Sequence, residues 1–156
     1  MKAEAEKILK LLKDNKVIYH LYEHDPVYTS EEAAKVRGVE LKSGCKSMIL
    51  RLTNGEFILA NLAADRKIDM KKLGAIANST LRFATKEEVL AVTNCQPGSV
   101  PPFGRLWSLK SFLDESILQN SEANFNIGLL TQSVRISVSD LIRIMNPTVA
   151  SFSKLQ

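Results

Sequence analysis

The chain has 156 residues, of which 45% are hydrophobic and 24% charged, with a formal net charge of +4. This composition excludes a disordered or fibrous protein, and the length predicts one domain spanning residues 1–156. No apolar run approaches the roughly 18 residues of a membrane span, and the N-terminus lacks the apolar core of a signal peptide. We therefore expect a cytoplasmic protein with no membrane partner. The positive charge slightly favours a polyanionic partner, although a lysine-rich solvated surface gives the same total.

The first two predicted elements are a helix and a strand. Apolar residues recur with helical spacing from Ala5 to Leu12, which predicts an amphipathic helix ending near Asn15. The segment 17–23 is rich in β-branched and aromatic residues, and this pattern predicts a strand that stops before Pro26.

Three short helices are predicted from residues suited to capping an N-terminus. Thr29 and Glu32 have the spacing of a capping box, and Gly38 can end the helix that they begin. The other two are a helix capped by Asp69 that runs to about residue 77, and a helix that begins with the box Thr85–Glu88 and runs to about residue 92.

A β-hairpin is the strongest local prediction, because Asn54-Gly55 joins two apolar segments, 45–52 and 56–62. The remaining predicted elements are a loop over 93–104, strands near 106–113, 124–128 and 133–138, and a last helix capped by Ser139 and ending before Pro147. Strands and short helices do not alternate regularly, so we expect an α/β protein of the α+β type with a mixed or antiparallel sheet.

The segment Pro97–Gly104 has the most unusual composition. Its glycines allow close approach of the backbone to a ligand, while two adjacent prolines stiffen it. The amides of Gly98, Ser99 and Val100 could therefore face an oxyanion or a ribose hydroxyl. The alternative is a rigid structural connection.

Lys46 begins the first strand of the predicted hairpin. A lysine is most often a solvated surface group. The following strand is apolar, however, so the ammonium group of Lys46 can point along a cleft. Neighbouring side chains of a regular strand face opposite sides, and we therefore expect Cys45 to pack in the interior rather than to line the same cleft.

Cysteine and metal chemistry have little support. Cys45 and Cys95 are expected to be two reduced thiols, and no spacing pairs either with His20 or His24 as a nucleophile and its base. No pattern of metal ligands is present, so we expect no metal and no cofactor.

A separate group of basic residues could contact phosphates, although a charged helix face gives the same pattern. Its members are Arg66, Lys67, Lys71 and Lys72.

Five short segments together resemble the YbaK/prolyl-tRNA synthetase-associated editing domain family, in order and spacing, across nearly the whole chain. They are Glu23–Thr29, Gly44–Ser47, Ala64–Lys67, Leu81–Phe83 and Gly98–Gly104. The resemblance implies a curved, mixed and largely antiparallel sheet packed with short helices. It also implies a trans-acting deacylase of mischarged tRNA, typically tRNA for proline. Its implied partner is the tRNA acceptor end, with an aminoacyl-tRNA synthetase as a second candidate partner.

The resemblance also implies which residues form the site. The family's essential lysine corresponds to Lys46, which would hold a phosphate or the ester, and the catalytic set is completed by Gly98, Ser99 and Val100. The residues implied to bind substrate are His24, Thr29, Ser47, Arg66, Arg82, Pro101, Pro102, Phe103, Gly104, Gly128 and Leu130. An aminoacyl ester is already activated, so such a site needs no side-chain nucleophile.

Two positions depart from the family pattern. Pro101 stands where a serine is common, and Leu130 stands where some alanine-editing relatives have histidine. Both changes leave the edited amino acid open, because apolar pockets discriminate by only about 1–3 kcal/mol per methylene. The alternative function is a non-catalytic module that binds the tRNA acceptor end in the same pocket.

Overall fold

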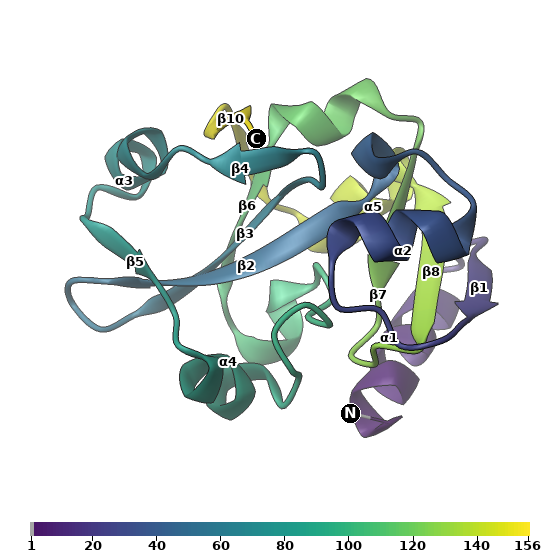
Figure 1. The fold of residues 1–156 in the computed structure, drawn as a ribbon. Helices are drawn as coiled ribbons and strands as arrows, with labels where there is room; N and C mark the ends of the chain where they lie inside the picture. The colour runs from purple at the N-terminus through teal and green to yellow at the C-terminus, as the bar shows by residue number, and fades with distance from the viewer. Residues whose placement is uncertain (1) are drawn as a thin grey trace.

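The computed structural model describes residues 2–156 (Figure 1). The helices are α1 (Lys2–Asp14), α2 (Ser30–Arg37), α3 (Met70–Ala77), α4 (Lys86–Thr93) and α5 (Val138–Met145), with 3-10 turns η1 (Leu41–Ser43), η2 (Gly104–Trp107) and η3 (Glu115–Gln119). The strands are β1 (His20–Glu23), β2 (Cys45–Leu52), β3 (Phe57–Ala63), β4 (Arg66–Ile68), β5 (Leu81–Phe83), β6 (Lys110–Asp114), β7 (Glu122–Asn126), β8 (Gln132–Ser137), β9 (Thr148–Ala150) and β10 (Ser153–Leu155).

The strands form a mixed five-stranded sheet, a three-stranded antiparallel sheet and a two-stranded ladder. The five-stranded sheet has the order β5-β2-β3-β6-β9, with β6 parallel to both of its neighbours. The three-stranded sheet has the order β1-β8-β7, and β4 pairs with β10. The predicted α/β class with a mixed sheet is confirmed, but the strands are divided among three sheets. Within residues 2–156, one isolated backbone bridge pairs Gly44, the residue before β2, with Asn124 of β7.

The predicted hairpin is confirmed as β2 and β3. These strands pair in register from Cys45 opposite Ala63 to Arg51 opposite Phe57. Gly55 has a φ of 92°, which glycine adopts without steric penalty. This rigid hairpin fixes the position of Lys46 at the start of β2.

The predicted caps of three helices are confirmed. Thr29 accepts a hydrogen bond from the backbone amide of Glu32 at the start of α2, and Gly38 ends this helix with a φ of 68°. Asp69 caps α3, and Thr85 and Glu88 form both halves of a capping box at α4. The predicted cap of α5, Ser139, was wrong. The side chain of Ser137 accepts the hydrogen bond from the backbone amide of Asp140, because β8 leads directly into the helix.

The segment before β6 differs from its prediction as a strand. Residues 104–107 form η2, and β6 begins only at Lys110. Gly104 packs so closely that an added Cβ would lie 2.5 Å from Ser111 Oγ and 3.0 Å from the Leu109 carbonyl oxygen. The chain therefore turns tightly here before it can extend. The first strand is also shorter than expected, since β1 begins at His20.

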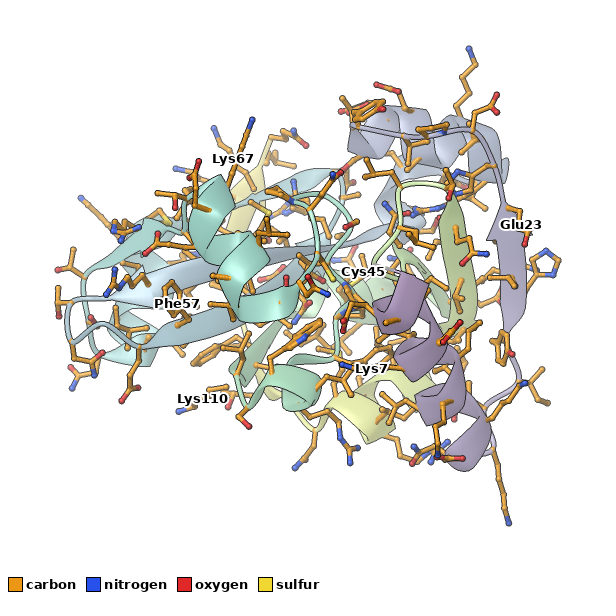
Figure 2. The ribbon with its side chains drawn as sticks, turned by 90° about the horizontal axis from the view of Figure 1, so that it is seen from below. Lys7, Glu23, Cys45, Phe57, Lys67 and Lys110 are labelled. Atoms are coloured by element: carbon orange, nitrogen blue, oxygen red, sulfur yellow. The ribbon has the colours of Figure 1, made fainter. Side chains whose placement is uncertain are left out.

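The main hydrophobic core lies between the three-stranded sheet and helices α1 and α5. Ile8 and Leu12 of α1 pack there with Phe125, Val134 and Leu141. A second core involves the five-stranded sheet and α3. Figure 2 shows Cys45 in the interior, whereas Glu23, Lys67 and Lys110 lie at the periphery. None of the helices in residues 2–156 is long and apolar enough to cross a membrane.

A buried carboxylate fastens the last strand to the sheet. Asp114, at the end of β6, accepts hydrogen bonds from the amide of Phe152 at 2.8 Å, the hydroxyl of Ser153 at 2.6 Å and the amide of Ser116 at 3.0 Å. Burial raises the pKa of this carboxyl, but the hydrogen bonds to Phe152, Ser116 and Ser153 outweigh burial, so its pKa lies below the ordinary value.

We expect Asp114→Asn to lower the free energy of unfolding by about 2–3 kcal/mol, because an amide cannot accept from every donor that faces it. A carboxyl with a lowered folded pKa stabilises the protein above its unfolded pKa, and this contribution is lost as pH falls through the folded pKa. The difference between wild type and variant should therefore shrink below about pH 4. Denaturant unfolding at several pH values measures it, and a difference independent of pH would contradict the assignment.

Candidate functional site

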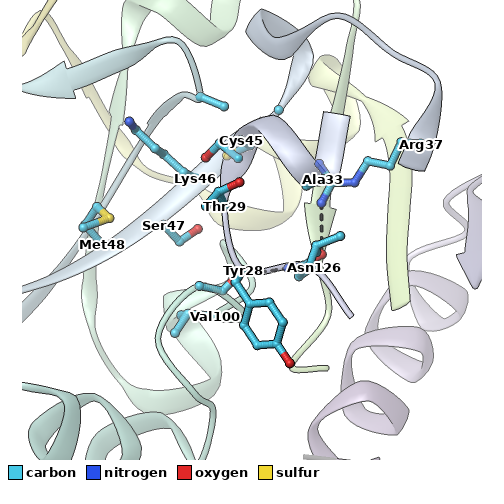
Figure 3. A pocket seen from close by; sticks show the side chains of 15 residues that line it. Tyr28, Thr29, Ala33, Arg37, Cys45, Lys46, Ser47, Met48, Val100 and Asn126 are labelled. Carbon is cyan, nitrogen blue, oxygen red and sulfur yellow. Dashed lines mark hydrogen bonds between the residues drawn. The ribbon is translucent and has the colours of Figure 1, made fainter. Parts of the chain in front are cut away.

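A pocket of about 150 Å³ lies between α2 with the segment before it, the start of β2, and the turn around Gly98 (Figure 3). Its walls combine apolar and polar groups. They are formed by Val27, Tyr28, Thr29, Ser30, Ala33, Arg37, Gly44, Cys45, Lys46, Ser47, Met48, Ala64, Gly98, Val100 and Asn126. The sequence prediction placed Lys46 and the glycine turn in one pocket, and the structure brings them together there.

The backbone before Lys46 approaches its neighbours closely. A Cβ on Gly44 would lie 2.9 Å from the Cβ of Ala64 and 3.3 Å from the carbonyl oxygen of Leu41. Only glycine fits without a shift of backbone or neighbour, and the Ala64 amide donates to the Gly44 carbonyl at 2.8 Å. This contact sets where β2 begins and therefore where Lys46 enters the pocket.

The ammonium group of Lys46 is half-buried, and within residues 2–156 it forms no hydrogen bond or ion pair. Burial lowers the pKa of Lys46, and the more distant carboxylates of Glu31 and Asp65 act in the opposite direction. An ammonium group that is partly desolvated and has no close partner is suited to bind an anionic or carbonyl oxygen of a ligand.

The turn at Gly98 offers two free amides rather than three. Gly98 has a φ of 89°, and neither its N–H nor that of Val100 forms a hydrogen bond within the described part of the chain. Ser99 differs, because its N–H donates to the Gln96 carbonyl at 3.0 Å and its hydroxyl donates to the same oxygen at 2.8 Å. Ser99 therefore holds the turn, and the free donors beside the pocket are those of Gly98 and Val100.

A hydrogen-bond network holds the turn against α2. The Asn126 amide group donates to the Gly98 carbonyl at 2.9 Å, and its oxygen accepts from Arg37 Nη2 at 3.0 Å. Ser133 Oγ donates to the same oxygen of Asn126 at 2.8 Å and accepts from Arg37 Nε at 3.0 Å. Arg37 and Asn126 were missed by sequence reasoning, although both line the pocket.

Arg37 brings a second positive charge to the pocket. Burial lowers its pKa to about 10, so the guanidinium group stays protonated at neutral pH. Within residues 2–156 no carboxylate lies within ion-pair distance of it. Figure 3 shows Arg37 and Lys46 on opposite sides of the pocket, with Thr29 and Ser47 between them. A ligand that carries negative charge or a polarised carbonyl would be favoured here.

Thr29 and Ser47 line the pocket as predicted, but their hydroxyls have partners in the protein. The Thr29 oxygen accepts the capping hydrogen bond of α2. The Ser47 hydroxyl donates to Asn61 Oδ1 at 2.7 Å, and the Asn61 amide group donates to the Phe112 carbonyl at 3.2 Å. These contacts keep both side chains in place along the pocket wall.

Cys45 packs in the main core, as expected, yet it also lines the pocket beside Lys46. The prediction that Cys45 would not share the pocket with Lys46, which was based on strand alternation, was therefore wrong. Burial raises the pKa of the Cys45 thiol to about 12 and also raises that of Cys95, so neither forms a thiolate readily. His24 hydrogen-bonds to Ser133 and to the Asp25 carbonyl rather than to a thiol. This geometry gives no support to a cysteine nucleophile.

Several predicted residues lie behind the pocket rather than in its walls. Phe103 and Gly104 are buried, and the Phe103 ring packs edge-to-face on Phe125 with centroids 5.5 Å apart. The amide of Gly128 donates to the Ser99 carbonyl at 2.8 Å, which supports the turn from the rear. The prolines of the turn are also buried, at Pro101 and Pro102.

Four other predicted residues are not brought into the pocket. The guanidinium of Arg82 donates two hydrogen bonds to Glu88, at 2.8 and 3.0 Å, and these bonds are the largest cause of a Glu88 pKa lowered to about 2. Arg66 donates to the hydroxyl of Ser153 at 3.0 Å. The Leu130 carbonyl accepts from the amide of Val27, and His24 joins the network only through Ser133.

No group of three His, Cys, Asp or Glu side chains is placed to hold a metal ion among residues 2–156. The site's donors are instead the amides, the ammonium group and the guanidinium group described above. Such groups stabilise developing negative charge on an oxygen atom.

Comparison with known proteins identifies the family of this chain. The sequence profile of the aminoacyl-tRNA editing domain matches residues 24–144. The chain is 29% identical over 154 residues to the multifunctional Ser/Thr-tRNA deacylase ProXp-y of Escherichia coli K12, covering 96% of this chain and 92% of that protein. It is 28% identical over 155 residues to the prolyl-tRNA editing protein ProX of Acetoanaerobium sticklandii, covering 96% and 94%. A crystal structure of a candidate trans-editing enzyme for prolyl tRNA synthetase superposes with a TM-score of 0.86 at 25% identity and covers 97% of each chain.

These matches define the class of protein, a hydrolase that removes the amino acid from wrongly charged tRNA. The chain belongs to the aminoacyl-tRNA editing domain family, and it is of the YbaK and ProX type that its five sequence motifs indicated.

Proposed function

We propose that the chain hydrolyses, in trans, the ester bond of tRNA for proline that carries the wrong amino acid. One observation carries this proposal: Lys46, Gly98 and Val100 line the same pocket. The curated relatives named for deacylation and for prolyl-tRNA editing support it, since each aligns over nearly the whole chain.

The reaction requires little from the protein beyond placement and electrostatics. Water adds to the ester carbonyl carbon, the carbonyl oxygen becomes negative, and the carbon–oxygen bond to the ribose then breaks. The proton that water releases ends on the ribose hydroxyl. In the proposed mechanism, the amides of Gly98 and Val100 stabilise the oxyanion, and Lys46 holds the terminal phosphate or the ester.

The pocket walls favour a small amino acid. Val27, Ala33 and Met48 provide apolar contact, whereas Arg37 and Asn126 are polar. A small side chain would leave the most room for the ester to reach the turn in this cavity of about 150 Å³. We propose tRNA for proline charged with a small amino acid as the substrate.

The test is a panel of tRNAs for proline charged with alanine, serine, threonine, cysteine or proline, together with correctly charged tRNAs of other kinds. Loss of the ester from at least one small mischarged species, with several turnovers per enzyme, supports the proposal. Binding of the acceptor end without turnover of any species would instead identify the non-catalytic module. Absence of both binding and turnover would reject the pocket as a tRNA site.

A further inference from the structure

A group of cations lies beside the pocket, and the reaction chemistry does not use it. We call it the basic track; its members are Arg66, Lys67, Lys71, Lys72 and Lys154. The track begins two residues after Ala64, which lines the pocket, and it continues through β4, its partner β10 and the first turn of α3. Figure 1 shows α3, β4 and β10 at the top of the view, above β2.

Two lysines of the basic track lie directly opposite each other. Lys67 of β4 is paired in register with Lys154 of β10, and both side chains are exposed. Their neighbours Ile68 and Ser153 are buried, so the lysines occupy the solvent face of the ladder. Like charges directly opposite in an antiparallel pair destabilise it, and nothing in the ladder itself explains this choice.

The start of α3 carries a second unfavourable placement. Lys71 and Lys72 lie in the first turn, where the helix dipole favours acidic residues, and this turn contains none. The cap residue Asp69 uses its carboxylate to accept from the Lys72 amide. Within residues 2–156 none of the four lysines of the basic track forms an ion pair. Residues 64–77 contain two acidic residues, Asp65 and Asp69.

We propose that the basic track binds the sugar-phosphate backbone of the tRNA acceptor stem while the charged end occupies the pocket. This inference rests on the proposed function. A phosphate backbone favours closely spaced lysines that form no ion pair in the protein, because neutralising the backbone releases condensed counterions. Such contacts position the duplex without reading its sequence. Ala64 lines the pocket together with Lys46, and Asp65 connects Ala64 to Arg66, so the track starts at the edge of the pocket.

The experiment compares the double variant Lys67→Glu, Lys154→Glu with Lys13→Glu, Lys110→Glu, which has the same change of charge. Figure 2 shows Lys110 on the side of the molecule opposite Lys67, and Lys13 belongs to α1. Binding of uncharged tRNA for proline is measured between 50 and 300 mM salt, and hydrolysis is measured on charged tRNA and on a charged CCA trinucleotide.

The track variant should bind tRNA roughly 5- to 20-fold more weakly at low salt, and the slope of log affinity against log salt should fall by about two. Its KM for charged tRNA should rise with kcat unchanged, and its activity on the trinucleotide should equal that of wild type. The control variant should change less than threefold. Equal losses in both variants, or an unchanged salt slope, would overturn the track. A wild type that hydrolyses neither substrate would reject the proposed function, while the binding slopes would still decide the track.

The single variant Lys67→Glu separates binding from folding. It places opposite charges across the ladder, so its thermal unfolding midpoint should be equal to or above that of wild type while tRNA affinity falls. A purely structural role for Lys67 predicts that stability and affinity change together, and that result would count against the proposal.

Discussion

Replacing Lys46 by alanine should reduce deacylation by about 100- to 1000-fold, with little change in stability. The ammonium group is half-buried, has no protein partner among the described residues, and lies in the same pocket as the Gly98 turn. Loss of one charge-stabilising donor in an acyl-transfer site costs on the order of 3 kcal/mol in the transition state. Single-turnover hydrolysis of the best mischarged substrate measures the loss directly.

The matched control is Lys42→Ala. Lys42 lies four residues earlier and is exposed, and among the described residues its ammonium group forms an ion pair with Glu40 alone. This variant should keep wild-type activity. A Lys46→Ala enzyme with more than half of the wild-type rate would show that the pocket works without this cation.

The charge of Lys46 also predicts a pH dependence. Burial lowers its pKa, so the ammonium group is lost at a lower pH than for an exposed lysine. Enzyme-dependent hydrolysis, corrected for the spontaneous reaction, should fall as pH rises through this lowered pKa. Lys46→Arg keeps its charge to higher pH, and its profile should lack this fall even if its rate is lower. If wild type and Lys46→Arg lost activity at the same alkaline pH, a group other than Lys46 would cause the pH dependence.

The second large effect is expected for Asn126→Leu. Leucine has a similar volume but cannot donate to the Gly98 carbonyl or accept from Arg37 and Ser133. The guanidinium of Arg37 would lose an acceptor in a buried place, and we expect a loss of about 2–3 kcal/mol in the free energy of unfolding. Because the turn would lose its tether, kcat should fall by about 10- to 100-fold.

Asn124→Leu is the control for this positioning role. Asn124 lies two residues earlier on β7, is buried like Asn126, and donates to Ser43 rather than to the pocket. Both variants should lose stability, but only Asn126→Leu should lose kcat at a temperature where both are folded. Equal kinetic losses would assign the effect of Asn126 to general destabilisation.

Much of the site could be predicted because its parts carry local signals. Lys46 follows a tight glycine at the start of a hairpin, and the Gly98 turn stands out by composition. Arg37 and Asn126 could not be found in this way, because their contact joins positions 89 residues apart. An arginine in the last turn of a helix is also an ordinary helix-end residue. Likewise, the hydrogen bond from the Ser99 amide to the Gln96 carbonyl depends on the backbone conformation of the turn, which the sequence does not specify.

The missed strands have a related cause. β4, β5, β9 and β10 have three residues each, which is too short for a periodic pattern. They exist because strands distant in sequence pair with them, as β10 does with β4. The N-terminal caps of α2, α3 and α4 and the turn of the hairpin were predictable because their determinants lie within four residues of one another.

The two larger sheets have little backbone pairing with each other, so a ligand in the pocket would connect them. Lys46 belongs to one sheet and Asn126 to the other. In residues 2–156 one isolated backbone bridge connects them, between Gly44 just before β2 and Asn124 of β7. A substrate that contacts both Lys46 and Asn126 would therefore hold the two sheets together. Backbone amide protons of β2 and β7 should then exchange more slowly with solvent when the pocket is filled.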